Sequence, residues 1–221
     1  MPRTFLTTGA ERVARLFVRE IEEGIEDTGV KPALIKASTD LEGLTPGVEL
    51  SLRSAALASL ATGTPISTHT WAPGRTGELQ VEMFEREGVD PTRVCIGHSD
   101  DTDDIPFLIS LLDRGVWLGL DHMANYGHRE GTPDSATRME TIWKLVEAGY
   151  ERQLLLSHDF WISVGVFTSD QMADLQAGNP DGYSFIPLRV LPRLKVLGAS
   201  EAQITTLTVD NPRRFLTGVA S

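Results

Sequence analysis

The chain has 221 residues, 41% hydrophobic and 23% charged, which is enough to bury a core and unlike the composition of a disordered or fibrous protein. Its net charge of -11 argues against a broad surface for nucleic acid or anionic membrane and favours a small neutral or polar ligand. A single cysteine, Cys95, excludes an intramolecular disulfide. No apolar stretch approaches the about 18 residues of a membrane span, so we expect a cytoplasmic protein.

Apolar residues recur at helical spacing near the start of the chain and predict an amphipathic helix over residues 9–24. A short apolar run at 33–35 follows and predicts a buried strand that ends at Lys36. Thr45-Pro46 then predicts the beginning of a helix, and Gly63 its end.

The alternation of apolar runs and helices continues to the end of the chain. Further helices are expected at 77–87, 105–114, 135–148, 185–197 and from 200, and Asn211-Pro212 is expected to open a last turn. Four more apolar runs each lead to a polar residue: 64–68 to His69, 93–97 to His98, 116–120 to Asp121 and His122, and 153–157 to His158 and Asp159.

Five strands alternating with helices indicate an α/β protein with parallel strands and crossover helices. The polar groups lie one to a strand, about one strand–helix unit apart, at the carboxyl ends where active sites of (β/α)8 barrels lie. An open doubly wound sheet would gather its ligands mainly at one switch point. The pattern therefore favours a partial (β/α)8 TIM barrel of about five strands, with residues 1–221 as one incomplete barrel domain.

Each of these polar residues, taken singly, has an ordinary structural explanation, such as a strand-end lysine or a hydrogen-bonded histidine. Taken together they are chemically compatible with a divalent metal ion, because imidazoles and carboxylates suit zinc, cobalt, manganese or iron. The working hypothesis is a metal-dependent hydrolase.

Motifs along nearly the whole chain resemble the C-terminal portion of bacterial phosphotriesterases and phosphotriesterase-like lactonases, of the amidohydrolase superfamily. The segments are GIEDTGVKPALIKAST, ISTHT, RVCIGHSDDTDD, LGLDHM, LLLSHD, NPDGYSFIPLRV and VDNPRRFL. GHSDDTDD and IPLRV are highly specific, whereas ALIKAST alone would not be.

The resemblance implies a metal site and identifies its ligands. In that family a carbamylated lysine bridges two metals, which corresponds to Lys36 here, and two histidines bind the more exposed metal, which correspond to His69 and His98. The aspartate that ends the last strand binds the buried metal and accepts a proton, which corresponds to Asp159. Zinc is the expected ion, with cobalt, manganese or iron as alternatives.

The resemblance also implies a proton relay from Asp159 through His122 to Asp101, with Asp121 lining the pocket. The substrates that the resemblance implies are small organophosphate triesters or lactones. A bound metal acidifies water and polarises a phosphoryl or carbonyl oxygen, so one hydroxide could attack either kind of ester. Phe160 and Trp161 are candidates for an apolar leaving-group pocket.

The sequence departs from the family in two ways. It has no His-x-His pair, which in the family completes the buried metal site, and by motif it begins just before the family's fourth strand. Five strands alone would leave two unpaired edges and an open barrel interior. Either the chain is a fragment of a longer protein or it completes itself by association, and we expect a homo-oligomer that covers these surfaces.

These departures leave alternatives to a hydrolase open. One is a catalytically weak or inert truncated barrel that persists as an oligomeric structural module. Another is an unrelated barrel enzyme that forms a Schiff base at Lys36, which would leave His69, His98 and Asp159 without a role.

Overall fold

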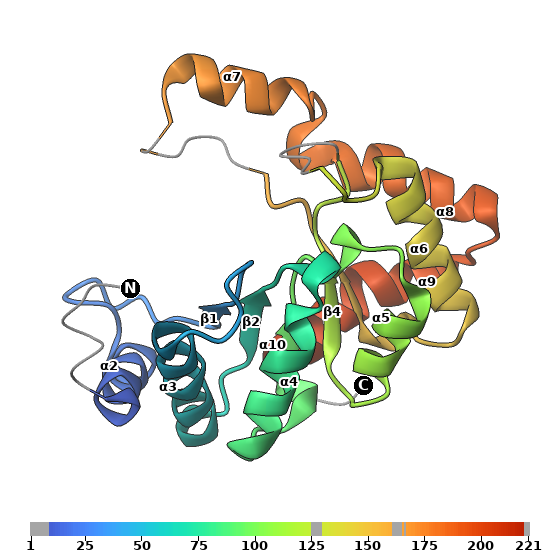
Figure 1. The fold of residues 1–221 in the computed structure, drawn as a ribbon. Coiled ribbons are helices and arrows are strands. Elements are labelled where there is room, and N and C mark those ends of the chain that lie inside the picture. Colours follow the sequence, from blue (N-terminus) through green and yellow to red (C-terminus); the bar gives the residue numbers. More distant parts are fainter. Residues whose placement is uncertain (1–8, 125–129, 161–164, 166, 219–221) are drawn as a thin grey trace.

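A computed structural model describes residues 9–124, 130–160, 165 and 167–218. Within this part of the chain, five strands form one parallel sheet in the order β1-β2-β3-β4-β5, with helices between successive strands (Figure 1). The predicted α/β fold is therefore confirmed, and the sheet is not closed. The strands are β1 (Ile35–Ser38), β2 (Ile66–His69), β3 (Val94–Ile96), β4 (Trp117–Leu120) and β5 (Leu154–Leu156).

Helices connect and follow the strands, and all but α7 lie where the sequence predicts them. The α-helices are α2 (Ala10–Glu23), α3 (Pro46–Thr62), α4 (Thr76–Arg86), α5 (Ile105–Leu112), α6 (Ser135–Glu147), α7 (Ser169–Ala177), α8 (Leu191–Leu197), α9 (Glu201–Thr205) and α10 (Asn211–Thr217). Short 3-10 turns are η1 (Ala72–Gly74), η2 (Pro91–Arg93), η3 (Ser99–Asp101), η4 (Glu151–Gln153) and η5 (Gly182–Ser184). Two π-helical turns are η6 (Ile186–Val190) and η7 (Thr206–Asp210).

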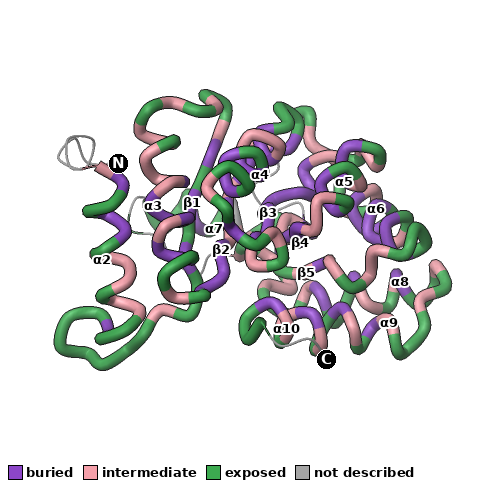
Figure 2. The backbone as a smooth tube through the Cα atoms, turned by 90° about the horizontal axis from the view of Figure 1, so that it is seen from below, coloured by how far each residue is buried: buried purple, intermediate pink, exposed green. Residues whose placement is uncertain are grey.

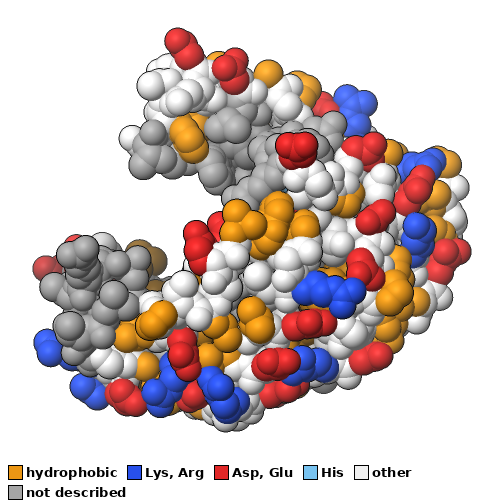
Figure 3. Space-filling view, viewed as in Figure 1, with side chains coloured by type: hydrophobic (Ala, Val, Ile, Leu, Met, Phe, Trp, Pro, Cys, Tyr) orange, Lys and Arg blue, Asp and Glu red, His pale blue; other side chains and the backbone are white. Residues whose placement is uncertain are grey.

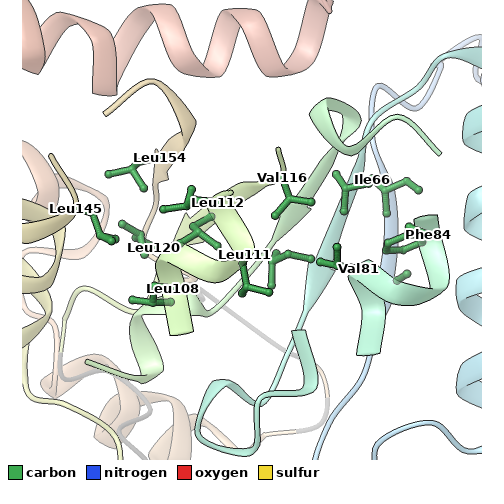
Figure 4. Close-up of a cluster of buried hydrophobic side chains, with 14 of the residues drawn as sticks. Ile66, Val81, Phe84, Leu108, Leu111, Leu112, Val116, Leu120, Leu145 and Leu154 are labelled. Carbon is green, nitrogen blue, oxygen red and sulfur yellow. The ribbon is translucent and has the colours of Figure 1, made fainter. Parts of the chain in front are cut away.

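The main hydrophobic core lies between one face of the sheet and helices α3 to α6. Alternate strand residues such as Ile66 and Leu118 point into it and meet leucines of α5 and aromatic or aliphatic residues of α4, as Figure 4 shows for Leu111, Val81 and Phe84. In Figure 2 the tube is buried along β3 and β4, whereas buried residues alternate with less buried ones along β1 and β2. Burial of this apolar surface is the main term that holds the layers together.

The opposite face of the sheet is only partly covered. Helix α10 packs against it through Phe215, which lies 5.7 Å from the Trp117 ring and contacts Cys95 and Leu155. Beside this small second cluster is a hollow of about 260 Å³ whose lining includes Leu34. In space-filling view the molecule is also hollowed between the α2 end and the α7 end (Figure 3).

The structure changes two details of the predicted elements. Lys36 is the second residue of β1 and not its end, because the strand continues to Ser38 in register with His69. The helix predicted at 185–197 is divided into η6 and α8. Pro192 has no N–H to donate to the carbonyl four residues earlier, which accounts for the wider turn before it.

The described residues include no helix that is long and apolar enough to cross a membrane.

Candidate active site

Three imidazole rings from neighbouring strands meet at the carboxyl edge of the sheet. His69 is the last residue of β2, His98 follows β3 by two residues, and His122 follows β4 by two. The His69 and His98 ring centroids are 4.4 Å apart and edge-on. The His98 and His122 rings are stacked, 4.1 Å apart and 10° from parallel. The structure thus brings together three of the side chains that the sequence singled out.

Two of the site residues, His98 and Asp159, have an unusual backbone conformation. His98 has φ 56° and Asp159 has φ 42°, both in the left-handed region that non-glycine residues seldom adopt and that is common at functional sites. The residue before His98 is Gly97, where a Cβ would lie 2.2 Å from the Thr68 carbonyl oxygen. Strands β2 and β3 approach each other here more closely than any other residue type would allow.

Asp121 holds His98 in place. Its Oδ1 accepts a hydrogen bond from the His98 backbone N–H at 3.0 Å and lies 2.7 Å from the ring Nδ1. A proton on Nδ1 satisfies this carboxylate and leaves Nε2 as the atom that can bind a metal, the arrangement in which a carboxylate orients a metal-binding histidine. The sequence predicted Asp121 to line the pocket; the structure places it beside His98.

His122 lies between two carboxyl groups. Its Nε2 is 3.4 Å from Asp159 Oδ2, and its Nδ1 is 3.0 Å from both carboxyl oxygens of Asp101. Burial lowers the pKa of His122, but the hydrogen bonds to Asp101 and Asp159 and the charges of Asp101 and Asp100 outweigh this effect and raise the pKa to about 10. Burial also raises the pKa of Asp101, but His122 and Arg138 overcome it, so the Asp101 pKa is lowered.

Two further residues complete this network, and the sequence reasoning missed both. Asp100 is fully buried and Arg138 is 3% exposed, and the guanidinium lies between Asp100 and Asp101. Burial and the nearby Asp121 charge raise the pKa of Asp100, although Arg138 lowers it. The adjacent acids in GHSDDTDD were a signal for Asp100, whereas an arginine on a helix gives no signal that it is buried.

Lys36 lies on the same face of the sheet as His69, two positions earlier in register. It is exposed, and its Nζ donates to the Thr68 carbonyl at 2.9 Å. The backbone of His69 is held by α4, because the Gln80 side chain donates a hydrogen bond to the His69 carbonyl oxygen at 2.8 Å. The His69 Nε2 is 3.7 Å from Asp40.

The two aromatic candidates have different outcomes. The Phe160 ring packs against Tyr183 at 5.2 Å, and the Tyr183 hydroxyl donates to the Phe160 carbonyl at 3.0 Å. This contact joins the segment that follows β5 to the segment around η5, and a pocket role for Phe160 stays a prediction. Trp161 lies outside the described residues.

The ligand atoms of His98, Asp121 and His122 all lie within 4.8 Å of one another. With His69 and Asp159 adjoining them, the cluster is composed of nitrogen and oxygen donors that suit a divalent ion of the zinc type.

Comparison with known proteins identifies the family of this chain. The model of the phosphotriesterase family matches residues 2–216. The chain belongs to the phosphotriesterase family. The matched range includes all five strands.

Three relatives show the range of this family. The chain is 40% identical over 207 residues to the phosphotriesterase homology protein of Mycobacterium tuberculosis, covering 94% of this chain and 62% of that protein. It is 34% identical over 215 residues to the aryldialkylphosphatase of Saccharolobus solfataricus (97% and 67%). It is 32% identical over 210 residues to the N-acetyltaurine hydrolase of Dictyostelium discoideum (90% and 54%). The chain thus spans less than two thirds of the mycobacterial relative.

Proposed function

We propose that this chain provides the catalytic site of a metal-dependent hydrolase that cleaves small organophosphate triesters or lactones. The observation that carries the proposal is the line Asp159, His122, Asp101, which adjoins the His69–His98 pair. A carboxylate followed by a histidine and a second carboxylate is a route by which a proton can leave a reaction centre. Family membership and the relative named aryldialkylphosphatase support the same chemistry.

His69, His98 and Asp159 would hold the ion, with Lys36 as a further ligand once carbamylated. As an amine that donates to Thr68, Lys36 is a hydrogen-bond donor, and carbamylation would give it the anionic oxygen that a metal requires. When bound, the ion would supply Lewis acidity toward water and toward the phosphoryl or carbonyl oxygen of the substrate. Zinc is the ion that we propose, and since no His-x-His pair is present we expect one ion per chain.

The protein groups have separate tasks in this proposal. Asp121 orients His98 through Nδ1. Asp159 Oδ2 would take the proton of the attacking water, and His122 Nε2, 3.4 Å away, would pass that proton on toward Asp101. Asp101 keeps the imidazole oriented by accepting from Nδ1. Phe160 contributes through loop packing against Tyr183.

The decisive experiment measures bound metal and turnover in the same preparations. The purified chain is expected to retain about one equivalent of zinc and to hydrolyse a chromogenic aryl dialkyl phosphate or a lactone. An N-acetyl amide belongs in the substrate panel because one relative is named N-acetyltaurine hydrolase.

His98→Ala should lose both metal and turnover, while His158→Asn, a histidine that packs on Tyr183, should keep both. A parent protein that binds no metal at micromolar zinc would refute the proposal. It would leave the inert oligomeric module as the better description.

A second measurement concerns Lys36. Added bicarbonate should increase the amount of bound zinc, and Lys36→Met should abolish that increase. Trapping of a carbonyl substrate at Lys36 by borohydride would instead support Schiff-base chemistry.

A further inference from the structure

Arg138 is a buried cation in the first turns of α6, a place where arginines normally face solvent. Its Nη1 donates to Asp101 Oδ1 at 2.7 Å and to Asp100 Oδ2 at 3.2 Å. All three side chains are nearly inaccessible, at 3%, 6% and 0% exposed. Buried charges persist only when they are paired and hydrogen-bonded, so the position of each of these groups depends on the other two.

Asp100 transmits this arrangement to the end of β4. Its Oδ1 accepts from the backbone N–H of Asp121 and its Oδ2 from the backbone N–H of His122, each at 2.9 Å. One carboxylate therefore sets the backbone of two consecutive residues. Asp121 orients His98, and His122 contacts Asp159, so both working side chains project from the segment that Asp100 holds.

Arg138 also reaches the segment that precedes α6. Its Nε donates to the Pro133 carbonyl at 2.9 Å, and its Nη2 donates to Thr132 Oγ1 at 3.3 Å. A guanidinium presents its five N–H groups in a fixed plane, so these bonds and those to the acids hold one another in register. A lysine could supply the positive charge but not several donors fixed in one plane.

We propose that Arg138 is a positioning residue that sets the ring orientation of His122 through Asp101 and Asp100, and that couples this orientation to residues 132–133. Its catalytic meaning rests on the function proposed above. The positioning role rests on the hydrogen bonds of Arg138 alone.

The test uses ring nitrogen resonances of the 15N-histidine-labelled, metal-free protein, with His122 assigned by its loss in His122→Gln. Wild type should show His122 with a hydrogen-bonded Nδ1–H. Arg138→Met should shift both His122 ring nitrogen resonances, because Asp101 is then no longer held against the Nδ1–H, and Arg138→Lys should restore them only partly. Arg114→Met, which removes a surface arginine paired with Glu85 at 2.8 Å, is the matched control and should leave His122 unchanged.

Kinetics of the zinc-loaded protein give a second readout. Loss of a group that orients catalytic residues from behind typically costs about 10-fold to 100-fold. We expect that loss in kcat for Arg138→Met, with KM changed less than about threefold, and partial rescue by added guanidinium salts. A purely structural arginine would lower the amount of folded protein without changing kcat per folded molecule.

A folded Arg138→Met protein with unchanged His122 resonances would overturn the proposal. If that variant does not fold, Asp100→Asn replaces it and should move the backbone amide resonances of Asp121 and His122. Unchanged amide resonances in this variant would also overturn the proposal. If wild type hydrolyses nothing while the His122 shifts appear as expected, the proposed function fails and the positioning role stands.

Discussion

At the scale of single residues, the site is built on hydrogen bonds that fix charge. His122 is mostly buried, which alone would favour the neutral ring, yet two carboxylates hold it as an imidazolium with a pKa of about 10. Asp101 owes its lowered pKa to His122 and Arg138. The same contacts that position these groups therefore make folding depend on pH.

For the metal-free protein we expect the free energy of unfolding to fall as pH rises from 7 to 10.5. An unfolded histidine has a pKa of about 6.5, so across this window the native state binds more protons than the unfolded state, and His122 contributes a slope of at most about 1.4 kcal/mol per pH unit. The contribution is fully present below the unfolded pKa and is lost as pH passes the folded value.

Urea titrations of wild type and His122→Gln at several pH values check this. The variant should show a flatter dependence between pH 7 and 10.5. Equal slopes would mean that His122 is not protonated in the native state.

Gly97 offers a test of how tightly β2 and β3 approach at the site. Gly97→Ala should destabilise the protein by more than about 2 kcal/mol, because its Cβ would collide with backbone and not with a movable side chain. Gly88→Ala is the control: Gly88 has φ 82°, but an added Cβ would meet no atom within 4 Å, so this change should cost only about 1–2 kcal/mol of backbone strain. Thermal unfolding compares the two, and equal losses would contradict the close approach.

At the scale of elements, local signals set the helix ends. Thr45 Oγ1 accepts from the Val48 N–H at 3.3 Å, and Gly63 ends α3 in the left-handed conformation. Ser200 and Gln203 form a complete capping box on α9. Helix α3 packs against β1 and β2, which carry Lys36 and His69, so its ends matter to the site.

Thr45→Ala should lower the free energy of unfolding by about 1 kcal/mol, because the Val48 N–H loses its partner. Thr45→Ser keeps the capping oxygen and should cost less than half of that. Denaturant unfolding of the two variants separates the cap from the loss of a methyl group. A Thr45→Ser protein as unstable as Thr45→Ala would show that the hydrogen bond is not what matters.

At the scale of the whole molecule, the described sheet has β1 and β5 as its outer strands. Its inner face, the one opposite helices α3 to α6, is covered only in part by α10. Lys36 is exposed on that face, and Leu34 beside it is 38% exposed. Unpaired edges and exposed apolar groups favour association. Homo-oligomerisation is therefore our proposal for how this face is covered.

We expect light scattering at micromolar concentration to give a mass above the 24.2 kDa of one chain. Leu34→Glu, on the inner face, should shift the distribution toward monomer. Val209→Glu, at a residue of η7 that is 57% exposed, should not. A wild-type protein that is entirely monomeric would contradict the proposal.

The sequence by itself determined the alternation of strands and helices, and it placed His69, His98, His122 and Asp159 near the ends of their strands. These features follow from local periodicity, caps and breakers, which act over a few residues. The end of β1 was misplaced at Lys36 because the polar Ser38 continues the strand on its open face, where apolar periodicity gives no signal.

Only the tertiary structure decided which polar groups pair. Three sets of hydrogen bonds each join segments more than 20 residues apart. They link Asp121 to His98, Asp100 to the backbone at the end of β4, and Arg138 to Asp101. Such contacts depend on how parallel strands align and on the path of the chain between them, neither of which a single stretch of sequence specifies. The physical reason is that burial, and not residue type, determines whether a charged side chain must find a partner.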